Sequence, residues 1–306
     1  MKKHAGKILI GILFLAGLSL LLYPFISNEW NNYRQKQLIS SYDQAIAEME
    51  TAGTIDYEAE WENAKDYNQA LLPSVLPDAF ANAKGEEAEG DSTYMSCLNA
   101  AGDGMMGTVE VPKIKITLPI FHGTSEETLD KAAGHLPGSS LPVGGESTHT
   151  VITAHRGLPS AALFTDLDKM EKGDHFLLHI LKETLCYEVD QITVVKPDDT
   201  ENLGVEDGMD LATLMTCTPY GVNSHRMLVR GHRVPYEPEE LADEGIPLAN
   251  MSLHTNYLLW VIVGILITAG FSFFLYRREK KLANNRVSDR QNAENEDPEK
   301  SKPQGE

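Results

Sequence analysis

Residues 213–230, TLMTCTPYGVNSHRMLVR, contain two β-type runs joined by a turn. The first run ends at Cys217, and Thr218-Pro219 begins the turn. Arg226 opens the second run, nine residues after the cysteine. A hairpin of the two runs brings Arg226 back beside the thiol. The stretch therefore predicts a sheet whose rim carries a sulfur and a guanidinium group.

Similar β-type runs precede this stretch, and its own second run continues to residue 234. They are rich in Val, Ile, Thr and Tyr, with Gly or Pro between them, which is typical of an all-β barrel or sandwich. The β core is expected over residues 105–236. The runs are 108–114, 116–120, 148–154, 175–181, 186–195, 212–216 and 226–234.

The residues before this core have a helical pattern. Between 27 and 70, aromatic and aliphatic residues recur at three-to-four spacing, with an interruption near Gly53. This spacing predicts two amphipathic helices joined by a turn. Residues 71–104 are rich in Pro, Ala, Gly and acids, so we expect a long connection with a short helix from Tyr94 to Leu98.

Two uncharged segments are long enough to cross a bilayer as helices. The first extends from Ile8 to Ile26, and the second occupies 257–276 and precedes a basic cluster at 277–281. Basic residues beside membrane helices stay on the cytoplasmic side, so both termini are expected inside and residues 27–256 outside. A cleaved signal peptide is the alternative for residues 1–26. Residues 237–256 would be a linker and 277–306 a cytoplasmic tail that cannot bury a core.

Composition narrows the classes of partner and cofactor. The net charge is −19, which argues against nucleic-acid or anionic-lipid binding, because neutralising phosphates requires clustered cations. Three cysteines, Cys97, Cys186 and Cys217, are too few for a disulfide scaffold. A disulfide between Cys97 and Cys186 is one alternative to two structural thiols. No cofactor is predicted, and no metal cluster of recognisable spacing is present in the sequence.

A histidine follows another apolar run. Residues 151–157 read VITAHRG, and His155 stands where the β-type run stops. Imidazole titrates near neutrality and can carry protons between a thiol and a leaving amine. The chain has 10 histidines, so chemistry alone does not select this one.

Longer motifs resemble a known family. The stretch TLMTCTPYGVNSHRMLVRGHR is similar to the TLxTC signature of sortases, the transpeptidases of Gram-positive cell surfaces. THTVITAHRGLPSAALFTDLDKM resembles their histidine segment, and MGTVEVPKIKITLPIFHGTSEETLDKAAGHLPGSSLPVGG resembles the opening of their barrel. The resemblance covers residues 94–234. It implies a closed sortase-type β-barrel of about eight strands, with Cys217 as nucleophile, His155 as proton-transfer partner and Arg226 as the group that steadies the reacting carbonyl.

Shorter motifs resemble class C, the pilin-polymerising sortases. These are HGT, GHL, SLPVGG, HRGLP, LFTDL and TCTPYGVNSHR. Such enzymes carry a C-terminal membrane helix and a lid with an Asp-Pro-aromatic motif. Here residues 76–80 read LPDAF, so Ala79 replaces the proline. By analogy Asp78 pairs with Arg226 and Phe80 covers Cys217, and Ala79 is expected to loosen the lid because proline restricts the backbone.

The resemblance implies a membrane-anchored cysteine transpeptidase. It would cleave an LPxTG-like sorting signal between Thr and Gly through a thioacyl intermediate and join it to a lysine amine of a pilin. Its expected partners are pilin subunits, an acceptor lysine or cell-wall amine, and the membrane. Three alternatives remain at this stage: a housekeeping sortase acting on peptidoglycan, a cysteine hydrolase, and a non-enzymatic membrane assembly scaffold.

Overall fold

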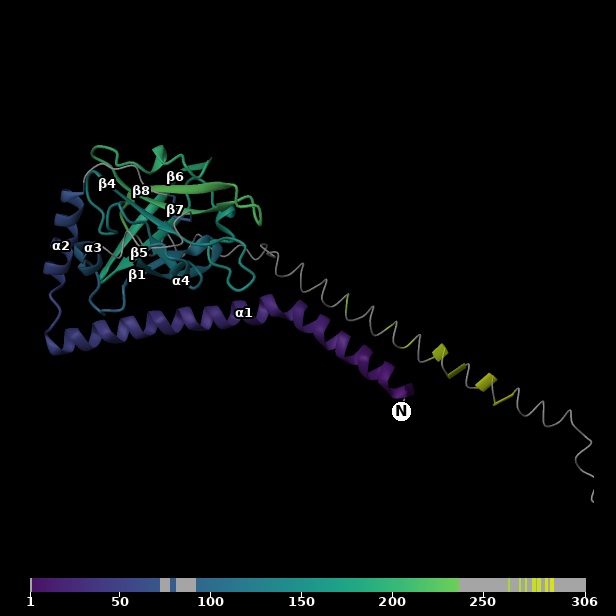
Figure 1. The fold of residues 1–306 in the computed structure, drawn as a ribbon. Helices are drawn as coiled ribbons and strands as arrows, with labels where there is room; N and C mark the ends of the chain where they lie inside the picture. Colours follow the sequence, from purple (N-terminus) through teal and green to yellow (C-terminus); the bar gives the residue numbers. More distant parts are fainter. Residues whose placement is uncertain are drawn as a thin grey trace, which may run out of the picture. The chain divides into compact units, whose positions relative to one another are not determined.

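The structure is a computed structural model that describes residues 2–71, 78–80 and 92–236, and scattered residues between 264 and 288. The chain divides into two units, Met1–Ile246 and Pro247–Glu306. The described residues of the second unit, from Gly264 to Ser288, are helical. The first unit holds the β core and the helices that precede it (Figure 1).

Eight strands form a closed barrel in the order β1-β2-β3-β4-β7-β8-β6-β5. The pairs β2–β3 and β4–β7 are parallel, and the other pairs are antiparallel. The strands are β1 Met105–Val111, β2 Ile116–His122, β3 Ala133–His135, β4 Thr148–Thr153, β5 His175–Ile180, β6 Glu183–Val195, β7 Asp210–Thr218 and β8 His225–Val234. The expected closed barrel of about eight strands is confirmed.

One strand was missed by the sequence pattern. β3 has only three residues, Ala133–His135, and one of them is glycine, so it has no β-type run. The position of β3 between β2 and β4 explains why residue 134 is a glycine. A Cβ there would lie 2.3 Å from the carbonyl oxygen of Gly123, so only glycine allows the two segments to approach.

Side chains alternate between the two faces of each barrel strand. On β4 and β7, Ile152, Ala212 and Leu214 are fully buried in the main core. Their neighbours Val151 and Met215 belong to a second, separate apolar cluster. The barrel therefore has its main core on one face of these strands and a smaller apolar surface on the other.

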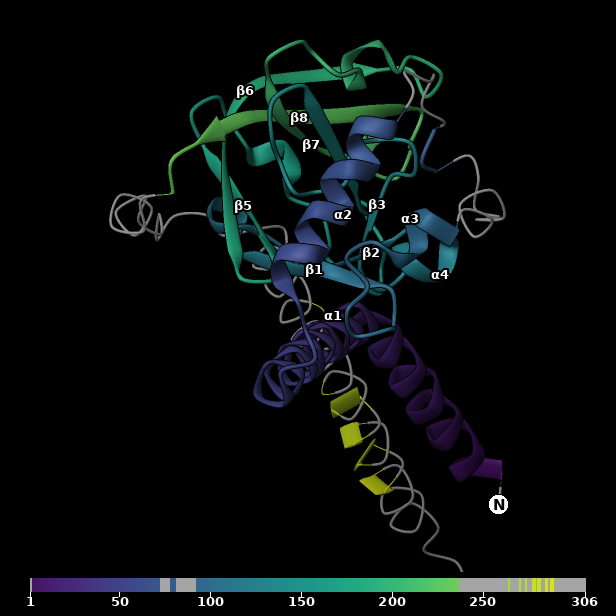
Figure 2. The ribbon, with the colours of Figure 1, turned by 90° about the vertical axis from the view of Figure 1, so that its left-hand side faces the viewer.

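Helices and short 3-10 turns surround the barrel, and α2 crosses one side of it (Figure 2). The helices are α1 Lys2–Ala52, α2 Tyr57–Ala70, α3 Ser92–Ser96 and α4 Glu126–Leu129, and the 3-10 turns are η1 Pro112–Ile114, η2 Leu167–Lys169 and η3 Glu201–Leu203. The predicted interruption falls where α1 ends, since Gly53 adopts a φ of 66°. Asp56 then caps α2 by accepting from the Ala59 amide at 3.0 Å.

α1 runs without a break across residue 26, the expected end of the membrane segment. It contains Pro24 and bends along its length (Figure 1). Within the described residues, one helix is long and apolar enough to span a membrane, Gly11–Ala52. The second expected membrane helix, at 257–276, lies almost entirely outside the described residues and stays a prediction.

The part of α1 beyond Ile26 docks on the barrel through one face. Asn28 Oδ1 accepts from the Ala162 amide at 2.8 Å, Asn31 Nδ2 donates to the Ser160 carbonyl at 2.6 Å, and Gln35 Nε2 donates to the Lys131 carbonyl at 3.0 Å. Further along, Tyr42 and Ile46 pack in an apolar cluster with Met105, Phe121 and Ala132. These contacts tie α1 to the loop that follows β4, to the segment between α4 and β3, and to β1 and β2.

Candidate functional site

Cys217 and Arg226 face each other across two neighbouring strands. They are direct partners in the antiparallel β7–β8 register. The turn between them contains Pro219, after a cis peptide bond, and Asn223 with a φ of 58°. Arg226 Nη1 donates to the carbonyls of Asn223 and His225 at 3.2 Å each, which holds the guanidinium at this end of the hairpin. The expected juxtaposition of sulfur and guanidinium is present.

His155 follows β4 at the same end of the barrel. β4 runs parallel to β7, with Thr153 opposite Met215, and the Ala154 amide donates to the Met215 carbonyl at 3.2 Å. Two further residues along each chain lead to His155 and Cys217. The carbonyl of His155 accepts from the Phe164 amide at 3.1 Å, which closes the loop that returns to the core. The three residues thus lie at the same end of the barrel.

Asp78 forms a two-point ion pair with Arg226. Arg226 Nε donates to Asp78 Oδ1 at 2.7 Å, and Nη2 donates to Oδ2 at 2.6 Å. Both side chains are only 9% exposed. The planar fork of arginine matches a carboxylate in this geometry, and such charge-assisted bonds are stronger than neutral ones. In this state the donors of Arg226 that would bind another acceptor are occupied by Asp78.

Phe80 lies between two of the three groups. Its ring centroid is 5.4 Å from that of His155, and the Arg226 Cζ lies 5.0 Å above its face. The Phe80 amide also approaches Asp78 Oδ1 at 3.4 Å. Residues 78–80 therefore form a short cap over the histidine and arginine, while Cys217 itself is 4% exposed.

Ala79 sits in an apolar patch on the outer face of the barrel. It is 1% exposed and clusters with Leu136, Val151, Leu203, Met215 and Leu228. We call these five residues the outer patch. The small Ala79 side chain is thus packed against the outer patch. The prediction that alanine here loosens the lid stays a prediction.

The electrostatic surroundings oppose a resting ion pair between thiol and imidazole. Burial raises the pKa of Cys217, Arg226 counteracts this by lowering it, and Asp78 raises it further. Burial lowers the pKa of His155, against the opposing effects of Asp130 and Glu126. Both shifts favour the neutral forms. With the cap in place, the charged pair is therefore a minor species.

Arg156 links the histidine loop to the cysteine strand, and sequence reasoning missed it. Its Nε donates to the Thr165 carbonyl at 3.1 Å, its Nη1 donates to Thr218 Oγ1 at 3.2 Å, and its Nη2 pairs with Asp168 at 2.5 Å. The side chain is 8% exposed. Because Arg156 follows His155 and Thr218 follows Cys217, this contact joins the two segments. The available signal was a charged residue two positions after the end of an apolar β-type run.

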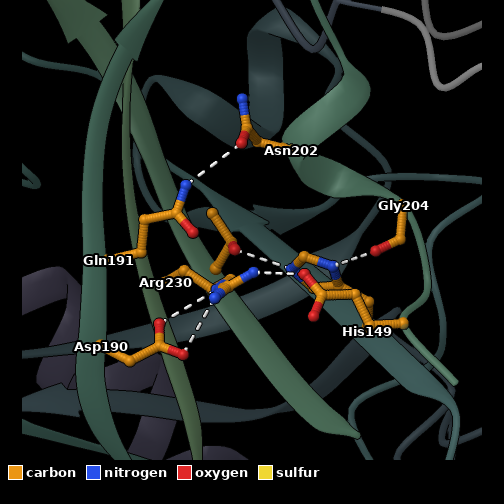
Figure 3. Close-up of polar contacts among 8 residues, drawn as sticks. His149, Asp190, Gln191, Asn202, Gly204 and Arg230 are labelled. Atoms are coloured by element: carbon orange, nitrogen blue, oxygen red, sulfur yellow. Dashed lines mark hydrogen bonds and ion pairs between the residues drawn. The ribbon is translucent and has the colours of Figure 1, made fainter.

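A second polar cluster lies further along the same strands (Figure 3). His149 Nδ1 is 2.7 Å from the Gly204 carbonyl, and its Nε2 is 2.7 Å from Thr213 Oγ1. A carbonyl only accepts, so Nδ1 carries the proton and Nε2 accepts from the threonine hydroxyl. Burial lowers the pKa of His149, which is consistent with this neutral form.

Arg230 completes this cluster. It makes a two-point pair with Asp190, at 3.0 Å for both bonds, and its Nη1 lies 2.5 Å from Glu206 Oε1 (Figure 3). Together His149 and Arg230 hold the loop that connects β6 and β7, since Gly204 and Glu206 belong to it. The same loop contributes Leu203 to the outer patch.

The other cysteines are remote from this chemistry. All three cysteines are buried thiols, so the alternative of a Cys97–Cys186 disulfide is not realised. Cys97 Sγ donates to the Asn63 carbonyl at 3.8 Å, and Cys186 lies within β6, opposite Val234 of β8. Among the described residues, no group of three or more His, Cys, Asp or Glu side chains could hold a metal ion.

Comparisons with known proteins point to one family. The family model described as the sortase domain matches residues 109–234. Sortase C from Streptococcus pneumoniae, whose crystal structure addresses catalysis and pilin substrate specificity, is 46% identical with a TM-score of 0.57, over 65% of this chain and 97% of that one. Sortase C1 from Streptococcus agalactiae is 47% identical with a TM-score of 0.58, over 66% and 100% of the two chains.

A curated relative is more distant. Sortase D from Bacillus subtilis is 31% identical over 131 residues, which is 42% of this chain and 63% of that protein. The chain thus spans less than two thirds of that relative's length.

Proposed function

Because the chain belongs to the sortase family of cysteine transpeptidases and its structural neighbours are class C sortases, we propose that it assembles pili. In this proposal it cleaves an LPxTG-like sorting signal between Thr and Gly and joins the new acyl group to a lysine amine of a pilin. The observation that carries the proposal is the meeting of Cys217, Arg226 and the His155 segment at one end of β4, β7 and β8.

The first half-reaction releases the part of the substrate after threonine. The Cys217 thiolate attacks the threonine carbonyl carbon, and the tetrahedral intermediate carries its negative charge on oxygen. Arg226 stabilises this oxyanion through its charge and its N–H donors. When the C–N bond breaks, the imidazolium of His155 gives its proton to the leaving glycine amine, and a thioacyl enzyme remains.

The second half-reaction uses the same groups in reverse. A lysine amine attacks the thioacyl carbon, and the now neutral His155 takes a proton from that nitrogen. The C–S bond breaks, the thiolate of Cys217 is restored, and an isopeptide bond joins the two pilins. Protons and charge balance over the cycle, and no atom changes its oxidation state.

The cap is proposed to be a resting-state lid. Asp78 occupies the donors of Arg226, and the ring of Phe80 lies against His155, so a substrate carbonyl cannot reach Arg226 while these contacts persist. The outer patch, where Ala79 packs, is apolar and adjoins Cys217 on β7, since Met215 is two residues away. We assign it to the Leu-Pro part of the sorting signal, because those are the apolar residues of that motif.

The location of the enzyme is part of the proposal. α1 contains the apolar run that qualifies as a membrane span, and the docked face of α1 begins directly after it. We therefore place the barrel at the outer surface of the cell membrane, with the N-terminus inside. The inside position of the C-terminus rests on the basic cluster at 277–281 alone.

One assay separates this function from its alternatives. The full chain is incubated with an LPxTG-like peptide and a pilin, and products are identified by mass spectrometry. We expect a thioacyl adduct on Cys217, a lysine-linked product, and loss of both in Cys217→Ala. Free acid as the main product, despite added pilin, supports a hydrolase. Linkage to a peptidoglycan amine but not to pilin supports a housekeeping sortase, and full pilus assembly by Cys217→Ala supports a scaffold.

A further inference from the structure

A cavity of about 740 Å³ opens beside the second polar cluster, away from the proposed catalytic groups. Its walls come from α2, from the segment between β3 and β4, and from the loop between β6 and β7. The lining includes Asn68, Leu71, Ser140, His149, Leu203 and Asp207. We propose that this cavity binds the residues of the substrate that immediately precede the sorting pentapeptide. The proposal rests on the proposed function and extends it.

The register of β7 places the cavity at the right distance from the sulfur. Thr213 is four residues before Cys217, and its hydroxyl contacts His149 in the cavity wall. Four residues of strand span about 13 Å. If the threonine of an extended signal lies at the sulfur, its leucine is about 10 Å away and the preceding residue about 13 Å away. The cavity therefore begins at the distance from the sulfur that the residue before the leucine would reach.

The outer patch connects the two sites. Leu203 belongs both to the outer patch and to the cavity wall. Leu203 is therefore the point at which a peptide with its leucine and proline on the outer patch would continue into the cavity. The acyl part of the substrate, which stays bound after cleavage, lies on the N-terminal side of the threonine. The bound peptide therefore runs from the cavity, at its N-terminal end, to Cys217.

Described residues of this chain stand at both ends of this route. Leu71 lines the cavity, Asp78 is bound to Arg226 and Ala79 packs on the outer patch. Seven residue steps separate Leu71 from Asp78, a span of at most about 25 Å. Leu71 precedes Asp78 in the sequence, so the order from the cavity wall to the catalytic end is N-to-C, which is also the order required of the substrate. A polypeptide is therefore the class of ligand that suits this route.

The wall of the cavity is held in place before any ligand arrives. His149 fixes the Gly204 carbonyl, and Arg230, oriented by Asp190, fixes Glu206 (Figure 3). On the opposite side, Asn68 of α2 bonds both the amide and the carbonyl of Leu141, at 2.7 and 3.2 Å. Both sides are thus tied to the barrel, so binding requires little ordering of the protein.

The test compares two peptides on the full chain. One is an LPxTG-like pentapeptide, and the other carries four additional residues at its N-terminus. We expect the longer peptide to have a KM about tenfold lower with a similar kcat, which is the gain from burying one additional side chain. Thioacyl formation is followed by mass spectrometry and release of the glycine product by its new amine.

Two variants fill the cavity from opposite sides. Val205→Trp acts from the β6–β7 loop and Gln69→Trp from α2, and both positions are exposed, so neither substitution removes a core contact. We expect each to abolish the advantage of the longer peptide and to leave the pentapeptide values unchanged. Val194→Trp, an exposed position outside the cavity lining, is the matched control and keeps the advantage.

The outcomes distinguish the two levels of the proposal. Equal KM values for the two peptides in the unmodified chain, or an advantage that persists in both Trp variants, overturns the cavity assignment while the proposed function stands. No thioacyl adduct with either peptide overturns the proposed function, and the cavity assignment with it.

Discussion

Replacing Asp78 by alanine is expected to accelerate alkylation of Cys217 by a small thiol reagent. The reason is the pair of hydrogen bonds that Arg226 donates to Asp78, at 2.7 and 2.6 Å. Each of the two side chains is 9% exposed. Hydrogen bonds to charged groups contribute about 1.5–3 kcal/mol each. Because water solvates both groups again in the open state, we take about 1.5–3 kcal/mol as the net free energy by which the whole contact stabilises the closed state. The open population then rises by about 10- to 150-fold, since 1.4 kcal/mol is a factor of ten.

The same change alters the pKa of the thiol. Asp78 raises the pKa of Cys217, so removing its negative charge stabilises the thiolate and lowers that pKa. Alkylation follows the thiolate, so the midpoint of its pH dependence is expected to move to lower pH in Asp78→Ala. The rate on the high-pH plateau reports access to the sulfur, and the midpoint reports its ionisation. Measuring the full pH profile therefore separates the two effects.

Two further variants complete this experiment. Phe80→Ala, alone and with Asp78→Ala, removes the ring that lies against His155 and Arg226 and is also expected to accelerate labelling. Asp174→Ala is the control, because it breaks an ion pair with Lys113 in the β1–β5 part of the barrel. Plateau rates for Asp78→Ala and the double variant equal to that of the unmodified chain would refute the lid.

The remaining predictions concern the arginine, the α1 contact and acid stability. Arg226→Lys is expected to lower kcat by about 100-fold, because lysine does not reproduce the fork of donors; near-normal turnover of an LPxTG-like peptide would count against the assigned role. Asn31→Asp is expected to destabilise the chain by about 1–3 kcal/mol in urea unfolding, since it replaces a buried donor by a carboxylate facing the Ser160 carbonyl. Asn28→Asp is the control, because it keeps the acceptor for the Ala162 amide and is expected to change the stability little. Equal effects of the two substitutions would contradict this α1 geometry. Burial lowers the pKa of His135 to about 4, so its neutral form is the native one. Neutral His135 contributes about 3 kcal/mol to the free energy of unfolding above pH 6.5, and this contribution is lost as the pH falls towards 4. His135→Gln should flatten the urea-unfolding stability over that range, and an unchanged slope would show that other groups cause it.

Much of the site could be predicted because its chemistry stands at strand ends. A β-type run that stops at a cysteine, another that stops at a histidine and a third that opens with an arginine are local patterns, visible without any contact map. The family resemblance then selected His155 among the histidines. The Asp78–Arg226 pair joins residues 148 positions apart, and only the motif analogy suggested it before the structure.

The sequence by itself determined most strands of the barrel, the helices before it and the residues at the rim, because each depends on short-range periodicity. Only the tertiary structure decided which face of each strand lies inside, since alternation defines two apolar faces on β4 and β7 and barrel closure assigns Ile152 and Leu214 to the core and Val151 and Met215 to the outer patch. It also decided the place of β3, whose glycine is required by a neighbouring carbonyl, and the docking of α1 on the loop after His155. These features depend on contacts between distant segments, and the local sequence carries no record of such contacts.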